Sequence, residues 1–194
     1  RHLLSTVQSS VKRMDRLTSN LLDMSQLESG KMSLIKTDVE IGPLIDELVV
    51  LLSAYAEERS IKIEFEAPEE GLSIYCDRDR VFQVIHNLLG NAIKFSDFGG
   101  TVGIRLKRAN ERLRFQFRNT GTGILPDELP LIFNRFWRSK KTALAGSGLG
   151  LYISYGIIEA HGGRMWAESK VGESTTFYFE LPAGNLPRLN TDHK

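Results

Sequence analysis

Hydrophobic residues change their spacing near residue 60, and this change constrains the fold more than any other feature of the chain. Before it, apolar residues recur at steps of three and four, which predicts amphipathic helices. After it, Ile61, Ile63 and Phe65 alternate with charged residues, which predicts a half-buried strand. Because helices are segregated from mostly antiparallel strands, we predict an α+β fold. It would be a two-layer α/β sandwich, with a mixed, mostly antiparallel sheet, helices on one face and a long N-terminal helix in front.

The remaining elements follow from the same patterns and from turn residues. Helices are predicted over 1–29, 43–59, 78–95 and 149–160, and strands over 61–66, 72–76, 102–106, 113–117, 163–169 and 175–181. Residues 31–40 are predicted as a linker, and 119–147 as mostly irregular chain.

The first helix carries one long apolar stripe, which leaves two interpretations open. The helix packs on its own domain, or it is half of a helical hairpin in a dimeric bundle. The second is favoured because the next hundred or so residues offer no obvious matching helix. The stripe consists of Leu4, Val7, Val11, Met14, Leu17, Leu21 and Met24.

Composition excludes some classes of partner and location. The chain has 25 basic and 24 acidic residues and a formal net charge of +1, so no field favours nucleic acid or an anionic membrane. The single cysteine, Cys76, cannot form an internal disulfide, and we interpret it as a buried structural thiol in a reducing compartment. With no apolar run near 18 residues and no signal peptide, we predict a cytoplasmic chain whose longer form could be membrane-anchored.

The helix over 78–95 carries polar side chains on one face. Asn87, Asn91 and Lys94 are spaced i, i+4 and i+7, so they point the same way. An amide oxygen suits a hard cation such as Mg²⁺, and an ammonium group can meet phosphate. An ordinary solvated face explains this pattern equally well.

Two glycine-rich segments follow. The segment Asn119, Gly121 and Gly123 comes directly after a strand. Because glycine has no side chain, the backbone there can approach a flat ligand closely. The alternative is a plain turn. Residues 146–151 lie at the start of a helix, where free N–H groups can form an anion site. The alternative is that this segment is only a flexible loop and helix cap.

The order of these segments resembles the histidine-kinase catalytic domain of the GHKL ATPase superfamily. Its N box is matched by the asparagine-rich helix, and its first glycine box by residues 119–124. Its F box is matched by the aromatic-basic segment 132–138, and its second glycine box by residues 146–151. Residues 171–182 resemble its closing pair of strands. Residues 21–31 resemble the end of the second helix of the dimerisation and histidine-phosphotransfer hairpin.

The resemblance implies a role for each matching position. It implies ATP and Mg²⁺ as cofactors, with Asn91 ligating the metal, Asn87 beside it, Lys94 near the phosphates and Phe95 flanking the nucleotide. Asn119 would read adenine. The other implied contacts are Gly121, Gly123 and Ile124 in the base pocket, Arg138 at the γ-phosphate, Gly148, Leu149 and Gly150 as the phosphate cradle, and Thr176 closing the adenine side. Residues 139–145 have few apolar anchors and would form a lid that is mobile without nucleotide.

Two departures from the family pattern matter. The adenine-reading residue is usually aspartate, and an amide in its place forms a bond roughly half as strong, so we expect weaker binding rather than none. No phosphate-accepting histidine motif is present. His2 lacks its surroundings, and His86 and His161 are interpreted as structural. We therefore expect no catalytic residue of that kind in this chain and no autophosphorylation by it alone.

The resemblance divides the chain into a partial dimerisation and phosphotransfer helix with its linker (1–36), a catalytic ATP-binding domain (37–183) and a loose tail (184–194). It implies a two-component sensor histidine kinase that transfers the γ-phosphoryl of Mg-ATP to a histidine outside this chain and onward to a response-regulator receiver domain. It also implies a homodimer through the N-terminal helix. The alternatives are a nucleotide-sensing or scaffolding pseudokinase with little turnover, and an ATPase clamp of the same superfamily, against which the N-terminal helix argues.

Overall fold

The computed structural model describes residues 2–67, 71–139 and 147–183; the side chains of 2–9, 12, 13 and 16 lie outside this description. The helices are α1 (His2–Glu28), α2 (Ile41–Glu57), α3 (Arg78–Phe95) and α4 (Gly150–Ala160), with a 3-10 turn at Leu129–Leu131. The strands are β1 (Thr37–Glu40), β2 (Lys62–Glu66), β3 (Ser73–Cys76), β4 (Thr101–Ala109), β5 (Arg112–Thr120), β6 (Arg164–Lys170) and β7 (Ser174–Pro182). The predicted tail, 184–194, lies outside the described residues.

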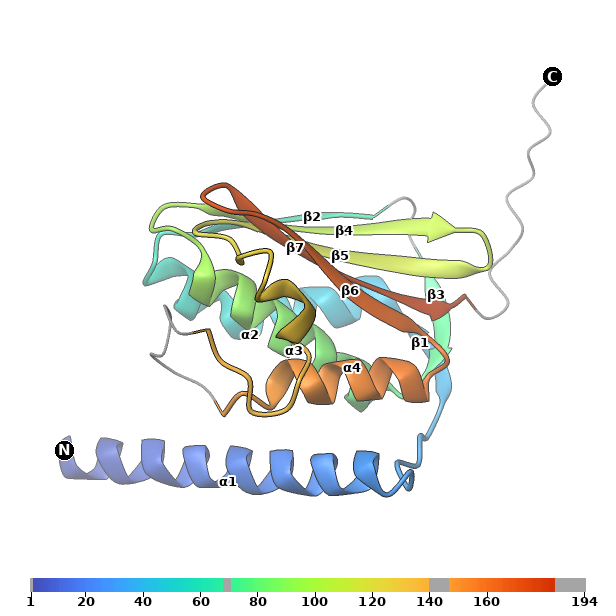
Figure 1. The fold of residues 1–194 in the computed structure, drawn as a ribbon, viewed down its shortest axis with the longest axis horizontal. Helices are drawn as coiled ribbons and strands as arrows, with labels where there is room; N and C mark the ends of the chain where they lie inside the picture. Colours follow the sequence, from blue (N-terminus) through green and yellow to red (C-terminus); the bar gives the residue numbers. More distant parts are fainter. Residues whose placement is uncertain (1, 68–70, 140–146, 184–194) are drawn as a thin grey trace.

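The main sheet has five strands in the order β2-β4-β5-β7-β6. The β2–β4 pair is parallel and the other pairs are antiparallel. Helices α2, α3 and α4 cover one face of this sheet, and α1 lies beneath them on the side away from the sheet (Figure 1). The predicted α+β, two-layer sandwich with a long N-terminal helix is confirmed.

One strand falls where a linker was predicted. Thr37–Glu40 forms β1, which pairs with β3 in a separate two-stranded antiparallel sheet, with Val39 opposite Ile74. Val39 is the buried residue of β1, while Thr37, Asp38 and Glu40 are exposed. A four-residue strand with one apolar side chain is too short to produce a readable alternation, so the sequence pattern missed it.

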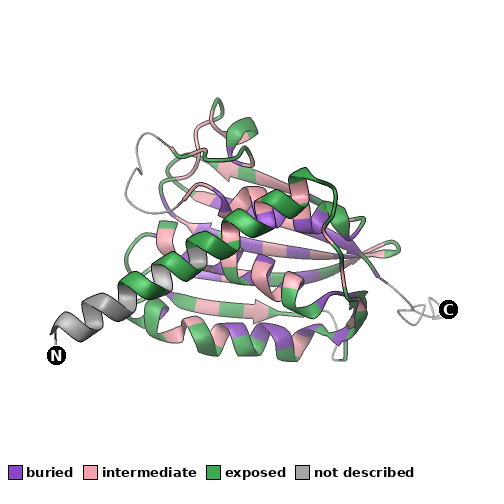
Figure 2. Cartoon of the chain, turned by 90° about the horizontal axis from the view of Figure 1, so that it is seen from below, coloured by how far each residue is buried: buried purple, intermediate pink, exposed green. Residues whose placement is uncertain are grey.

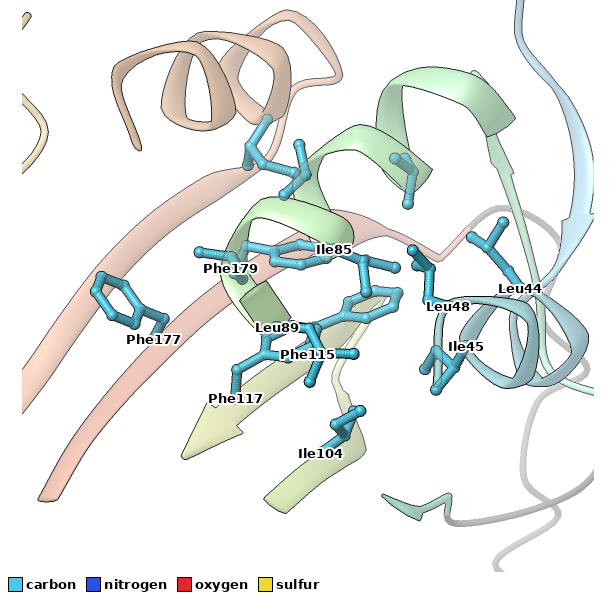
Figure 3. Close-up of a cluster of buried hydrophobic side chains, with 14 of the residues drawn as sticks. Leu44, Ile45, Leu48, Ile85, Leu89, Ile104, Phe115, Phe117, Phe177 and Phe179 are labelled. Carbon is cyan, nitrogen blue, oxygen red and sulfur yellow. The ribbon is translucent and has the colours of Figure 1, made fainter. Parts of the chain in front are cut away.

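The core lies between the main sheet and the helices. Leu44, Ile45 and Leu48 of α2 face Ile85 and Leu89 of α3, above aromatic side chains of β5 and β7 (Figure 3). The rings of Phe115 and Phe179 stack with their centroids 4.2 Å apart. Fully burying one such side chain stabilises the fold by about 1.5–3 kcal/mol, so this layer contact fixes α2 and α3 on the sheet.

One face of helix α1 packs on the rest of the domain near the end of the helix, and another face is exposed to solvent. Near its end, Leu27 packs against the core, and the buried carboxylate of Asp23 accepts hydrogen bonds from Arg80 (2.6 Å) and Gln83 (2.7 Å) of α3. Leu17 and Leu21 of the predicted stripe are 39% and 49% exposed. Figure 2 shows α1 crossing the helical layer with mostly exposed residues along its described length. The end of α1, including Met24 of the stripe, therefore packs on its own domain, while Val11, Met14, Leu17 and Leu21 of the stripe stay exposed.

Two buried groups at the start of α3 are structural. The Asp77 carboxylate accepts the backbone N–H of Arg80 and caps the helix, as N-terminal capping requires. Burial, with a smaller contribution from Asp77, raises the pKa of the Cys76 thiol to about 12, so this cysteine stays a neutral, unreactive thiol. Across the described residues, no helix is long and apolar enough to cross a membrane.

Candidate nucleotide-binding site

The asparagine face of α3 contacts the start of α4. Asn87 donates a hydrogen bond from Nδ2 to Ser154 Oγ (3.0 Å), and its Oδ1 lies so close to Gly150 that a Cβ there would be 2.4 Å away. Asn91 follows one turn later and is half-buried. The N box and the second glycine box, far apart in sequence, are thereby neighbours in space.

The glycines before α4 allow a close backbone approach. Gly148 has a positive φ of 71°, and a Cβ on it would meet the backbone of Phe136 at 2.6 Å. Leu149 is buried, and α4 begins at Gly150. The first N–H groups of a helix have no intrahelical acceptor, so this end of α4 can bind an anion.

The segment that carries Arg138 contacts this region through the backbone of Phe136. Phe136 itself adopts a positive φ of 59°, which is strained for a bulky residue, and its backbone contacts Gly148. Arg138 is two residues further on and exposed. Of the predicted lid, Ser139 is described and donates to the Glu128 carboxylate (3.0 Å); residues 140–145 lie outside the described part of the chain.

Asn119 lies at the end of β5 and is 3% exposed. Its Nδ2 donates to the backbone carbonyl of Thr120 (3.3 Å), which leaves Oδ1 as the group able to accept from a ligand. A buried amide oxygen at this place suits an amino group such as that of adenine.

Gly121 joins the same strand end to α3. A Cβ on Gly121 would lie 2.2 Å from the carbonyl oxygen of Phe95, the last residue of α3, so no larger residue fits. Phe95 is 38% exposed, and the Lys94 ammonium lies 4.7 Å from its ring centroid. Phe95 and Lys94 therefore stand beside the loop that contains Gly121.

The next part of this loop is fixed by the β6–β7 turn. Gly123 has a φ of 71°, and a Cβ on it would lie 2.7 Å from the carbonyl of Lys170. The backbone N–H of Ile124 donates to Ser169 Oγ (2.8 Å). The loop is thus held at both ends, by α3 and by β6.

The strand register places Thr176 away from Asn119. It pairs with Arg118, and side chains alternate along a strand, so it faces away from Asn119. Thr175 pairs directly with Asn119 and shares its face, with its hydroxyl 2.9 Å from that of Ser169. Thr175 therefore takes the place expected for Thr176.

The donor set available to a cation consists of amides. The described residues contain no group of three or more His, Cys, Asp or Glu side chains able to hold a metal. The amide of Asn87, beside the N-terminus of α4, and that of Asn91, one turn further along α3, fit a Mg²⁺ ion that takes most of its ligands from phosphates and water.

A hollow of about 770 Å³ lies elsewhere, between the end of α1 and α4. It is lined by residues including Leu27, Phe133, Tyr152, Tyr155 and Glu159. None of its lining residues belongs to the predicted nucleotide site. The hollow lies beside the docked end of α1, where Leu27 packs directly over Gly156 of α4.

Comparison with known proteins gives the same family as the motifs. Residues 76–185 match the family described as histidine kinase-, DNA gyrase B-, and HSP90-like ATPase. Sensory kinase SasA of Synechococcus elongatus is 30% identical over 93% of this chain and 47% of its own length. Sensor histidine kinase WalK of Bacillus subtilis is 32% identical over 92% of this chain and 30% of its own. The chain spans less than half of either relative.

Solved structures also match. The catalytic domain of histidine kinase ThkA is 32% identical, with a TM-score of 0.70 over 79% of this chain and 97% of its own. Full-length ShkA in complex with AMPPNP is 28% identical, with a TM-score of 0.84 over 95% of this chain and 39% of its own. ThkA in complex with response regulator TrrA is 28% identical, with a TM-score of 0.70 over 88% of this chain and 49% of its own.

Proposed function

Because the chain belongs to the histidine kinase-, DNA gyrase B-, and HSP90-like ATPase family, we propose that it is the ATP-binding catalytic region of a two-component sensor histidine kinase. It transfers the γ-phosphoryl group of Mg-ATP to a histidine outside these residues. Named histidine kinases among its relatives support this reading. The proposed parts remain the helix and linker over 1–36, the catalytic domain over 37–183 and the tail over 184–194.

One observation carries the proposal: helix α3 touches both candidate ligand regions. Its middle contacts the N-terminus of α4 through Asn87 and Gly150, and its end contacts the loop after β5 through Phe95 and Gly121. An anion site and a pocket for a flat base are therefore held at a fixed separation by one rigid helix. That arrangement suits a nucleotide with a phosphate chain.

Each end of the site has a separate task. At the base end, Asn119 accepts from the amino group of adenine while Gly121, Gly123 and Ile124 line the pocket, with Thr175 beside Asn119. At the phosphate end, the N–H groups after Leu149 bind phosphate oxygens, and Lys94 and Arg138 supply positive charge. Mg²⁺, held by Asn91 with Asn87 beside it, would neutralise phosphate charge. Phosphoryl transfer requires mainly positioning and charge neutralisation, which these groups provide.

The partners follow from the relatives. ThkA has been solved with a response regulator, and a receiver domain is the acceptor we propose here. A homodimer through α1 is supported by its exposed apolar stripe, which includes Met14, Leu17 and Leu21. His161 is buried with both ring nitrogens hydrogen-bonded, so we propose no phosphate acceptor there, and we propose a structural role for His86 on α3 as well.

The second candidate is a nucleotide-sensing or scaffolding pseudokinase. It is favoured by one feature, the neutral Asn119 where the family usually has a charged acceptor. Binding of nucleotide without transfer would be its signature.

The test of the nucleotide site is a comparison of Asn91→Ala with the unaltered chain. Calorimetric titration with ATP in Mg²⁺ and in EDTA should show a larger loss of affinity in Mg²⁺, because an oxygen ligand to the metal is removed. Gln26→Ala, which removes an exposed amide on α1 away from the proposed site, is the matched control. Equal losses in both conditions would give Asn91 a packing role, and no heat from the unaltered chain at saturating ATP would refute the proposal.

A further inference from the structure

Ser154 is a buried hydroxyl at the interface of α3 and α4. It is the fifth residue of α4 and 2% exposed, among apolar neighbours that include Ile153 and Ile157. A buried hydroxyl in such surroundings is costly unless it is hydrogen-bonded. Its partner is Asn87 of α3, whose Nδ2 lies 3.0 Å from Ser154 Oγ.

This bond fixes the Asn87 amide. With Nδ2 donating to Ser154, Oδ1 lies on the side of Gly150, where a Cβ would be 2.4 Å from it. No other hydrogen bond joins the Asn87 side chain to the described residues. The amide is therefore held between the Ser154 hydroxyl and the glycine that opens α4.

We propose that Ser154 is a positioning residue that sets the Asn87 amide against the phosphate-binding end of α4 without touching the nucleotide. The inference rests on the proposed function, in which this helix end receives the phosphates. Ser154 belongs to none of the motif segments, so its role follows from the α3–α4 contact alone.

The consequence is a coupling between two residues. Without the Ser154 hydroxyl, the Asn87 amide can rotate away, and its position relative to the first N–H groups of α4 is lost. Ser154→Ala should weaken Mg-ATP binding by about fivefold, the effect of one lost hydrogen bond. In an Asn87→Ala background the same change should have almost no effect on binding, because the group it orients is absent.

The experiment is a double-mutant cycle read by calorimetric titration with Mg-ATP. The four chains are the unaltered one, Ser154→Ala, Asn87→Ala and the double variant. Ile157→Val is the packing control: Ile157 is fully buried on the same helix, and this change lowers stability by about as much without removing a hydrogen bond. Ser154→Cys, which keeps the volume and weakens the hydrogen bond, serves if Ser154→Ala does not fold.

A loss confined to the chain that retains Asn87, with the affinity of Ile157→Val unchanged, supports the inference. Equal losses in both backgrounds, or unchanged affinity in Ser154→Ala and Ser154→Cys, overturn it. If the unaltered chain binds no Mg-ATP, the proposed function fails first, and the inference falls with it.

Discussion

At the scale of single residues, we propose that Asn119 sets how tightly the site holds the base. Its Nδ2 already donates to the Thr120 carbonyl, so in the proposed site Oδ1 would accept from adenine. A carboxylate there would add charge assistance. We predict that Asn119→Asp tightens ATP binding by about 1 kcal/mol, measured by calorimetric titration. Unchanged or weaker binding would mean that Asn119 does not read the base. Asn110→Asp, in the β4–β5 turn, is the control for the added charge.

His161 makes the stability of the fold pH-dependent. Its Nε2 accepts the backbone N–H of Asp77 (3.0 Å), so the ring is neutral and Nδ1 donates to the carbonyl of Ile157 (2.8 Å). Desolvation by burial lowers the pKa of His161 below 6.5, outweighing its bond to the Ile157 carbonyl.

The folded chain binds this proton more weakly than the unfolded chain does. The contribution of His161 to the free energy of unfolding is therefore fully present above pH 6.5 and is lost as the pH falls below that value. We predict this slope in urea unfolding measured between pH 7 and about 5. His161→Gln should flatten it, and His86→Gln, which alters an exposed histidine, should not. An identical slope in His161→Gln would contradict the assignment.

The site residues could be predicted from the sequence only where they belong to a spaced motif. The glycines that permit close approach, Gly121, Gly148 and Gly150, were all predicted, because each lies in a spaced pattern. Thr176 was chosen instead of Thr175, since the side of a strand that a residue faces depends on register, and two adjacent threonines give no local sign of it. Ser154 and Ser169 carried no signal, because their roles depend on contacts across elements.

At the scale of elements, the docking of α1 depends on one buried carboxylate. Asp23 is 4% exposed and is bound by Arg80 and Gln83, so removing it leaves both donors without this partner. Since Arg80 is partly exposed to solvent, the cost is smaller than for a fully buried pair, about 1–3 kcal/mol of docking free energy.

We predict that Asp23→Ala speeds hydrogen exchange over residues 20–28 while leaving the exchange of α3 unchanged. Asp15→Ala makes the same chemical change at an exposed position of the same helix and is the matched control. Equal protection of 20–28 in Asp23→Ala would show that Leu27 and Met24 alone hold the helix.

Element boundaries were predictable where the apolar period was long. The helix predicted over 78–95 matches α3 at both ends, because its start is capped by Asp77 and its apolar face is continuous. The linker prediction over 31–40 missed β1, whose pairing with β3 is a tertiary contact. Local patterns define an element; they do not reveal a short strand formed by pairing with a distant segment.

At the scale of the whole molecule, one apolar face of α1 stays exposed in the described part of the chain. Met14, Leu17 and Leu21 are exposed, on a different face of α1 from Asp23 and Leu27. At about 0.8 kcal/mol per buried methylene, covering this stripe stabilises an assembly by several kcal/mol. The sequence identified the stripe but not which face of α1 would dock on the domain.

We predict that the chain forms a dimer in sedimentation measurements and that Leu17→Glu dissociates it. Ser19→Glu adds the same charge on the opposite side of α1 and should leave the dimer intact. A monomer at all concentrations would remove the homodimer from the account.

The central claim is kinase activity toward a histidine outside this chain, and a transfer assay in trans tests it most directly. The chain is mixed with Mg-ATP labelled at the γ-phosphate and with a helical hairpin that carries the acceptor histidine. Asn91→Ala serves as the impaired control. We predict label on the hairpin that is stable to base and lost in acid, and much less of it with Asn91→Ala. A chain that binds ATP but transfers no label would contradict the kinase assignment and leave the nucleotide-sensing scaffold in its place.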